Sequence, residues 1–296
     1  MEQKAKNIED FELGIDFIPG EGDPTRAFKA MSGLIEAFQS LDSHLLSSFD
    51  VSLSTSLVLD AVESGSIKAK LRDIVQGIPD EALKNSEWKK IIGHFLLKGK
   101  YIVLEWLKER NEISSREDVR VLENRIKEAA EETDVKLLPA YSAPSAELLL
   151  SDIHSIQESL EYLDDRDTAF YGYDGNNVPL NKNLNISNEV IREVLTKEVV
   201  KSSGERVLKV KKPDYLGSSK WQFKYDGRTI EAKITDSEWL GMFQSRKEDV
   251  KPGDSLRVML YEEISYGYDG EVVHRYYKVE KVYEVIRLPV QGNIGF

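Results

Sequence analysis

One stretch constrains the fold of this chain more than any other: residues 221–234, Trp-Gln-Phe-Lys-Tyr-Asp-Gly-Arg-Thr-Ile-Glu-Ala-Lys-Ile. Two runs of alternating apolar and polar residues flank an Asp-Gly pair, which supplies the positive φ angles of a type I′ turn. A two-residue hairpin is therefore predicted, with Phe223 opposite Ile230 and Trp221 opposite Ala232. One face of this hairpin is apolar and fits a core, whereas the other face is polar.

The pattern around the hairpin favours a small barrel. Short helices are expected over residues 188–200 and 236–243. Strand-like runs lie at residues 207–210, 220–225, 228–234, 256–264 and 272–286. Three strands, a helix and two strands follow the order of an OB-fold, so residues 187–296 are predicted to form a small five-stranded OB-like β-barrel. A metal-dependent nuclease core has a similar order, but it needs a longer helix packed along its sheet.

The N-terminal part alternates between strand and helix patterns. Residues 11–17 alternate as a half-buried strand, and residues 27–45 repeat apolar side chains at helical spacing. Residues 51–61 and 67–71 are typical of a second hairpin with a longer turn. A β-α-β-β sheet with one long helix across it is therefore predicted.

A helical follow-on is expected to complete this domain, residues 1–163, and to make the chain α+β. Asp80 could cap its first helix, Gly99 could interrupt the helical pattern, and Ser115 opens a further helix. Periodicity is then lost over residues 164–186, which are rich in Asp, Asn and Gly. We predict a linker there, between the two domains.

Charge and cysteine content limit the function classes. The acidic residues behind the net charge of −12 lie mostly before residue 200, so the N-terminal part attracts nucleic acid poorly. The chain has no cysteine, which excludes disulfides and thiolate chemistry. No long apolar segment is present, and a cytoplasmic protein without a membrane partner is predicted.

One pattern suggests nuclease chemistry. Asp214, after a proline, and Glu231 and Lys233, on the polar face of the hairpin, have the outline of a metal-dependent nuclease signature. Two such carboxylates could hold Mg²⁺, which would activate water, while the lysine orients the nucleophile. Alternating charges on an exposed strand produce the same pattern without any catalytic role. No other metal site is predicted, because the histidines stand alone.

The same polar face suggests an anion-binding surface instead. Lys220, Lys224 and Lys233 project from it, where OB-folds take oligonucleotides. The aromatic residues of the hairpin, which could stack on bases, point into the core and argue against this interpretation. A glycine-rich loop at residues 20–23 precedes a helix, but Glu21 and Asp23 would repel a phosphate.

Two segments carry a resemblance to a group of proteins. The first runs from Lys212-Pro-Asp through Trp221 to Trp239, and the second is the helix followed by Glu63-Ser-Gly-Ser-Ile67. They resemble bacterial two-domain proteins without an assigned activity, some of them encoded among defence-related genes. Because the chain carries no specific catalytic motif, we expect a non-enzymatic binding or regulatory component of a bacterial assembly, with a protein partner or homo-oligomer, and the resemblance hints at a defence-related role. A Mg²⁺-dependent nuclease and a single-stranded nucleic-acid-binding protein remain the alternatives.

Overall fold

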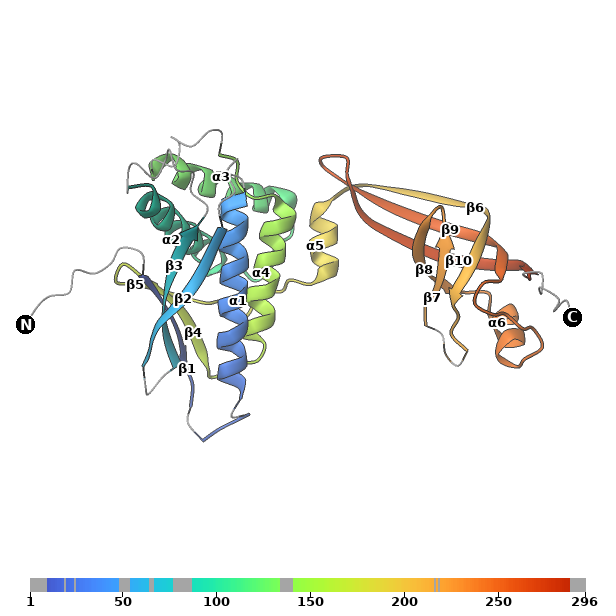
Figure 1. Cartoon of the computed structure of the whole chain (residues 1–296), viewed down its shortest axis with the longest axis horizontal. Helices are drawn as coiled ribbons and strands as arrows, with labels where there is room; N and C mark the ends of the chain where they lie inside the picture. The colour runs from blue at the N-terminus through green and yellow to red at the C-terminus, as the bar shows by residue number, and fades with distance from the viewer. Residues whose placement is uncertain are drawn as a thin grey trace, which may run out of the picture. The chain divides into compact units, whose positions relative to one another are not determined.

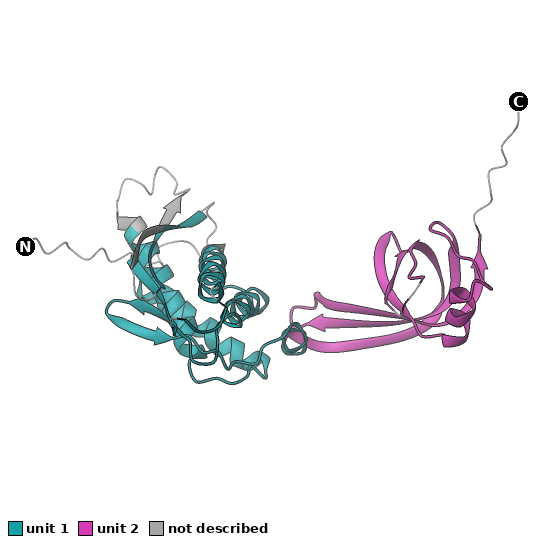
Figure 2. Cartoon of the chain, turned by 90° about the horizontal axis from the view of Figure 1, so that it is seen from below, with its two compact units in different colours: residues 1–194 teal, residues 195–296 magenta. Residues whose placement is uncertain are grey.

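The structure, a computed structural model, describes residues 10–18, 20–23, 25–47, 54–63, 67–76, 87–133, 141–215, 217 and 219–287. The chain divides into two compact units, residues 1–194 and 195–296 (Figure 2). Helices and separate sheets occur together, which confirms the α+β class. None of the helices in the described ranges has both the length and the apolar character needed to cross a bilayer.

The first unit is built on an antiparallel sheet in the order β2-β3-β1-β4-β5 (Figure 1). The strands are β1 (Asp10–Asp16), β2 (Ser54–Glu63), β3 (Ile67–Gln76), β4 (Thr168–Tyr173) and β5 (Asn176–Pro179). Along β1 the side chains alternate, so that Leu13 and Ile15 are buried while Asp10 and Asp16 are exposed. The predicted β-α-β-β order is confirmed, and β4 extends it to a motif of the ferredoxin-like type.

The helices described in this unit are α1 (Arg26–Ser47), α2 (Glu87–Leu107), α3 (Arg116–Glu132) and α4 (Ala146–Leu160), with α5 (Asn188–Leu195) at the end of the unit. Helices α1 and α2 pack on the sheet, and α3 and α4 pack on these two helices. Helix α1 packs along α4, and its Phe38 ring lies 6.5 Å from Phe11 of β1 and 5.8 Å from Tyr171 of β4. Buried aromatic rings thus join the helix layer to two neighbouring strands.

Helix α2 runs without a break through Gly99, which corrects the interruption expected there. A Cβ atom at this position would lie 2.9 Å from Cδ1 of Leu45 in α1. The glycine therefore allows close packing between two helices and does not end one. The predicted cap at Asp80 lies outside the described residues. Ser115 does cap α3, in a capping box with Asp118.

Residues 164–186, expected to be a linker, instead contain β4 and β5 of the first sheet. Strand β4 pairs with β1, so its Tyr171 is fully buried. The turn between β4 and β5 has positive φ at Asp174 and Gly175, and this turn chemistry resembles a loop in the sequence. Short strands separated by such a turn carry too few alternating positions to be recognised, and the division between the units follows Val194.

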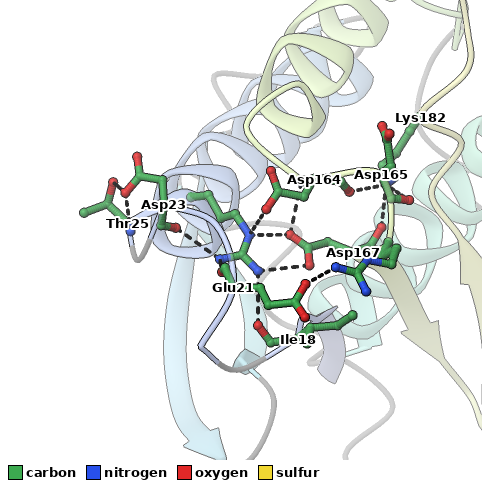
Figure 3. Close-up of polar contacts among 10 residues, drawn as sticks. Ile18, Glu21, Asp23, Thr25, Asp164, Asp165, Asp167 and Lys182 are labelled. Atoms are coloured by element: carbon green, nitrogen blue, oxygen red, sulfur yellow. Dashed lines mark hydrogen bonds and ion pairs between the residues drawn. The ribbon is translucent and has the colours of Figure 1, made fainter.

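A network around Arg26 holds the segment before β4 against the start of α1 (Figure 3). The Arg26 guanidinium donates to Asp167 at 2.6 and 3.2 Å and to the backbone carbonyls of Glu21, Asp23 and Ile18. The hydrogen bond from Arg26 lowers the pKa of Asp167. Every guanidinium proton is thereby bound to a protein oxygen. The network fixes the loop at residues 20–23 and leaves Arg26 no donor for a phosphate.

The second unit is a closed barrel in the order β10-β8-β7-β6-β9. Its elements are β6 (Thr196–Lys212), β7 (Trp221–Tyr225), β8 (Arg228–Ile234), α6 (Ser237–Gln244), β9 (Ser255–Gly267) and β10 (Val272–Ile286). Strands β8 and β10 pair in parallel and the other neighbours are antiparallel. The predicted five-stranded OB-like barrel is confirmed.

The first barrel strand is longer than expected. A helix was predicted to continue to residue 200, but α5 ends at Leu195 and β6 begins at Thr196. From Glu198 onward β6 pairs with β9, and these strand–strand hydrogen bonds replace the helical ones. Strands β6, β9 and β10 consequently continue beyond the short strands β7 and β8 as a three-stranded extension of the barrel wall.

The hairpin formed by β7 and β8 has the predicted register. Trp221 pairs with Ala232, Phe223 with Ile230 and Tyr225 with Arg228. Its turn has positive φ at both Asp226 and Gly227, as a type I′ turn requires. Helix α6 closes the barrel by placing the rings of Trp239 and Phe243 at 5.9 and 4.8 Å from that of Trp221.

Candidate nucleic-acid interface

The outer wall of the barrel carries the three lysines that the sequence placed on the polar face of the hairpin. Lys224 lies in β7 and Lys233 in β8, and both are exposed. Lys220 directly precedes β7 and is exposed as well. Because Phe223 and Ala232 are buried in the core, strand alternation turns these lysines outward.

A fourth lysine and two tyrosines join this surface from distant parts of the sequence. The parallel pairing of β8 with β10 sets Lys233 in register with Lys278. The antiparallel pairing of β10 with β9 then sets Lys278 opposite Tyr261. Residues in register on neighbouring strands share a face of the sheet. Tyr276, two residues before Lys278, points to the same side.

Lys220 and Lys278 each lie near one of the two tyrosine rings of this surface, and the two rings lie near each other. The ring centroids of Tyr261 and Tyr276 lie 6.4 Å apart at an angle of 69°. The Lys278 ammonium lies 4.6 Å from the Tyr261 centroid, and that of Lys220 lies 6.0 Å from the Tyr276 centroid. Both rings are half-buried, so each presents part of its surface to solvent. We call Lys220, Lys233, Lys278, Tyr261 and Tyr276 the lysine–tyrosine surface.

Acidic neighbours position this surface and moderate its charge. The Tyr261 hydroxyl donates a 2.8 Å hydrogen bond to Glu263, which also meets Lys201 at 3.5 Å. This hydrogen bond lowers the pKa of Glu263 and raises the pKa of Tyr261. Lys278 pairs with Glu280 at 2.9 Å. The surface therefore combines two aromatic rings with lysines. Lys233 is exposed, and the residue in register with it on β10 is a lysine and not a carboxylate.

The residues of the nuclease pattern have other partners. Asp214 lies in the loop after β6, where its carboxylate accepts hydrogen bonds from the Gly217 and Ser219 amides and, at 2.6 Å, from the Ser219 hydroxyl. Glu231 accepts from Gln222 at 3.1 Å. In the described ranges, no three His, Asp or Glu side chains are grouped so that they could hold a metal ion. Asp214 therefore closes its own loop, and the nuclease pattern stays a prediction.

A groove in the first unit has the opposite character. It measures about 630 Å³ and lies between α1 and α4. Its lining includes Glu36, Glu158 and Glu161. These carboxylates repel phosphate, which agrees with the acidic balance of the N-terminal sequence. This groove is therefore a poor site for nucleic acid.

Comparison with protein-family models, with curated proteins and with solved structures finds no match to this chain. The resemblance to bacterial two-domain proteins, and the defence-related role that it implies, therefore remain predictions.

The lysines of the hairpin were predicted from the sequence, whereas Tyr261, Tyr276 and Lys278 were not. The aromatic residues of the hairpin itself do point into the core, as predicted. The tyrosines come instead from β9 and β10, where alternation alone left open which face is the outer one. The signal in the sequence was the run Tyr276-Tyr277-Lys278, in which only one tyrosine can be core-facing. Tyr277 is the buried one.

Proposed function

We propose that this protein is a non-enzymatic, cytoplasmic binding protein whose C-terminal barrel binds single-stranded nucleic acid. The observation that carries the proposal is the lysine–tyrosine surface on the outer wall of the barrel. Proteins that bind single strands combine cations that follow the backbone with aromatic rings on which bases stack. Strand faces of OB-type barrels are suited to this task because they are open and extended.

The chemistry of the surface points to single strands and not to duplex. In a duplex the bases are already stacked on one another, so a tyrosine ring gains a base contact only from an unpaired strand. Lys220 and Lys233 supply charge for phosphates, and Tyr261 and Tyr276 supply stacking surfaces that accept any base. We therefore expect weak dependence on sequence and strong dependence on salt.

The lysine contribution can be tested by oligonucleotide binding. The affinity for a fluorescent single-stranded oligonucleotide should fall steeply with added salt, and Lys233→Glu should reduce both the affinity and the salt dependence. Each lost phosphate contact lowers the slope of log K against log salt by about 0.7 for single strands. Lys247→Glu is the matched control, because this lysine is also exposed but follows α6 and does not belong to the lysine–tyrosine surface. Equal effects from the two substitutions would contradict the proposal.

The tyrosine contribution has its own control. Tyr276→Ala should weaken binding by about 1–3 kcal/mol, because one stacked base loses its platform. Tyr276→Phe keeps the ring and should bind nearly as well as the unchanged protein. If both substitutions leave affinity unchanged, bases do not stack on this tyrosine.

The nuclease alternative gives a different result in the same samples. With Mg²⁺ or Mn²⁺ added, we expect the oligonucleotide to remain intact, because Asp214 is engaged by its own loop. Cleavage that Glu231→Ala abolishes without unfolding the protein would establish the nuclease function instead.

A further inference from the structure

One edge of the barrel extension lacks a neighbouring strand. Residues Glu198–Leu208 of β6 pair with β9 on one side, whereas β7 joins the other side of β6 only from Lys209. Within the described ranges, no strand pairs with residues 199–207 on that other side. An open strand edge presents backbone amides and carbonyls that can pair with another chain. The edge is nine residues long, which is enough for a complete strand pairing.

Three of the nine residues along this edge, Val199, Val200 and Val207, are exposed valines. Val199 is 42% exposed and Val207 is 52% exposed, and both lie on the same face of β6. Branched side chains of this kind pack well against cross-strand neighbours. Among the described residues, these valines have no cross-strand neighbour on the open side of β6.

On the face of β6 that carries Val199 and Val207, the residues are arranged symmetrically about Ser203, whereas on the other face Val200 would lie opposite Arg206. Val199 and Val207 lie four residues to either side of it, and Lys201 and Glu205 lie two residues to either side. An antiparallel pairing with a second copy, centred on Ser203, would therefore place valine opposite valine twice and lysine opposite glutamate twice. Centring two residues earlier, on Lys201, would place this lysine opposite its own copy, which is repulsive.

We propose that β6 pairs with β6 of a second copy of this chain, in antiparallel register centred on Ser203. The two three-stranded extensions then form one continuous sheet across a two-fold axis, as isologous interfaces require. If the two-fold axis is perpendicular to the sheet, the outer face of one copy continues into the outer face of the other copy. Because Tyr261 is in register with Ser203, the two lysine–tyrosine surfaces then lie on the same side of this sheet.

The first test is the mass of the full chain in solution, measured without nucleic acid. Sedimentation should give twice the 33.7 kDa mass of one chain at high concentration. Val199→Lys should shift the protein to the single mass at the same concentration, because it places a charge where valine met valine. The matched control is Val272→Lys, since Val272 is similarly exposed but lies at the other edge of the extension. A single mass at every concentration, or equal effects of the two variants, would overturn the proposal.

The register is tested by cross-linking, because the chain contains no cysteine of its own. Residues opposite each other on antiparallel strands have Cα atoms about 4.5–5.5 Å apart, which is within disulfide range. Ser203→Cys should therefore form a covalent dimer on mild oxidation. Ser202→Cys, on the opposite face and facing Gly204 of the other copy, should cross-link much less. Equal cross-linking of the two variants would refute this register, whatever the outcome of the oligonucleotide experiments.

Discussion

At the scale of single residues, the most consequential group is a buried ionic cluster in the first unit. The Lys100 ammonium of α2 lies 2.5 Å from Asp42 of α1 and 2.9 Å from Asp73 of β3, and all three side chains are fully buried. One oxygen of each carboxylate has no hydrogen-bond partner. Burial raises the pKa of Asp42 well above its usual range, and the charge of Asp73 adds to this effect. We infer that Asp42 keeps its proton to higher pH than an exposed aspartate does.

Lys100 keeps its charge within this cluster. Burial alone disfavours the ammonium, but the two carboxylates outweigh that effect and raise its pKa. A buried cation held between two carboxylates avoids the free energy of an isolated buried charge. The cluster joins two helices to the sheet at one point, yet it is closed to any ligand.

This protonation state predicts an unusual pH dependence. In the unfolded chain Asp42 loses its proton near pH 4, whereas the folded chain retains it to higher pH. Unfolding thus releases the Asp42 proton, so the contribution of Asp42 to the free energy of unfolding falls as pH rises above about 4, by at most about 1.4 kcal/mol per pH unit. Asp42→Asn carries no such proton, and its stability relative to the unchanged protein should increase from pH 5 to pH 7.

Denaturant unfolding of the two proteins at several pH values measures this difference. Asp165→Asn is the control, because Asp165 is an exposed carboxylate of the same unit and should show no such trend. Parallel stability curves for Asp42→Asn and the unchanged protein would mean that Asp42 is ionised in the folded state.

At the scale of elements, some strands and helices are determined by local sequence, whereas others form only through tertiary pairing. The hairpin of β7 and β8 follows from its turn, because Asp226 and Gly227 fix the register of every residue beyond them. Helix α3 follows from its capping box in the same local way. Strand β4 has no such local signal, and it exists because β1 offers it an edge to pair with.

The hairpin register gives a stability prediction. Phe223 is completely buried in the aromatic core, so Phe223→Ala should lower the free energy of unfolding of the barrel by about 3–5 kcal/mol. Gln222→Ala, on the outer face next to it, should stay within about 0.5 kcal/mol. Thermal or denaturant unfolding of the barrel measures both, and similar losses from the two substitutions would show that the pairing is shifted in solution.

At the scale of the whole molecule, the position of the division between the units matters most. The sequence placed it after residue 163, whereas the structure places β4 and β5 before it. Without β4, strand β1 would lose one neighbour and Tyr171 would leave the core of the first unit. The barrel, by contrast, has a core made wholly of its own residues.

Fragments of the chain test this division. A fragment of residues 1–194 should unfold cooperatively and remain monodisperse, and a fragment of residues 195–296 should do the same. A fragment of residues 1–163 should aggregate or lack a cooperative transition, because its sheet ends at an exposed edge of β1. Circular dichroism during heating distinguishes the cases. Cooperative unfolding of the 1–163 fragment would instead place the domain boundary after residue 163, as the sequence predicts.

The sequence by itself determined what depends on near neighbours in the chain. The α+β class, the β-α-β-β order, the capping of α3 and the hairpin at Asp226 all rest on periodicity or turn chemistry within about twenty residues. It also indicated that Lys220, Lys224 and Lys233 would be exposed.

Only the tertiary structure decided which distant residues meet. Tyr261 and Lys278 reach Lys233 because β8 pairs with β10 and β10 with β9. Lys100, an ordinary member of a basic stretch in the sequence, is buried because Asp42 and Asp73 lie beside it. Such contacts depend on how strands and helices are ordered in space. Local sequence patterns do not specify that order, because it is set by packing between segments that are distant in the chain.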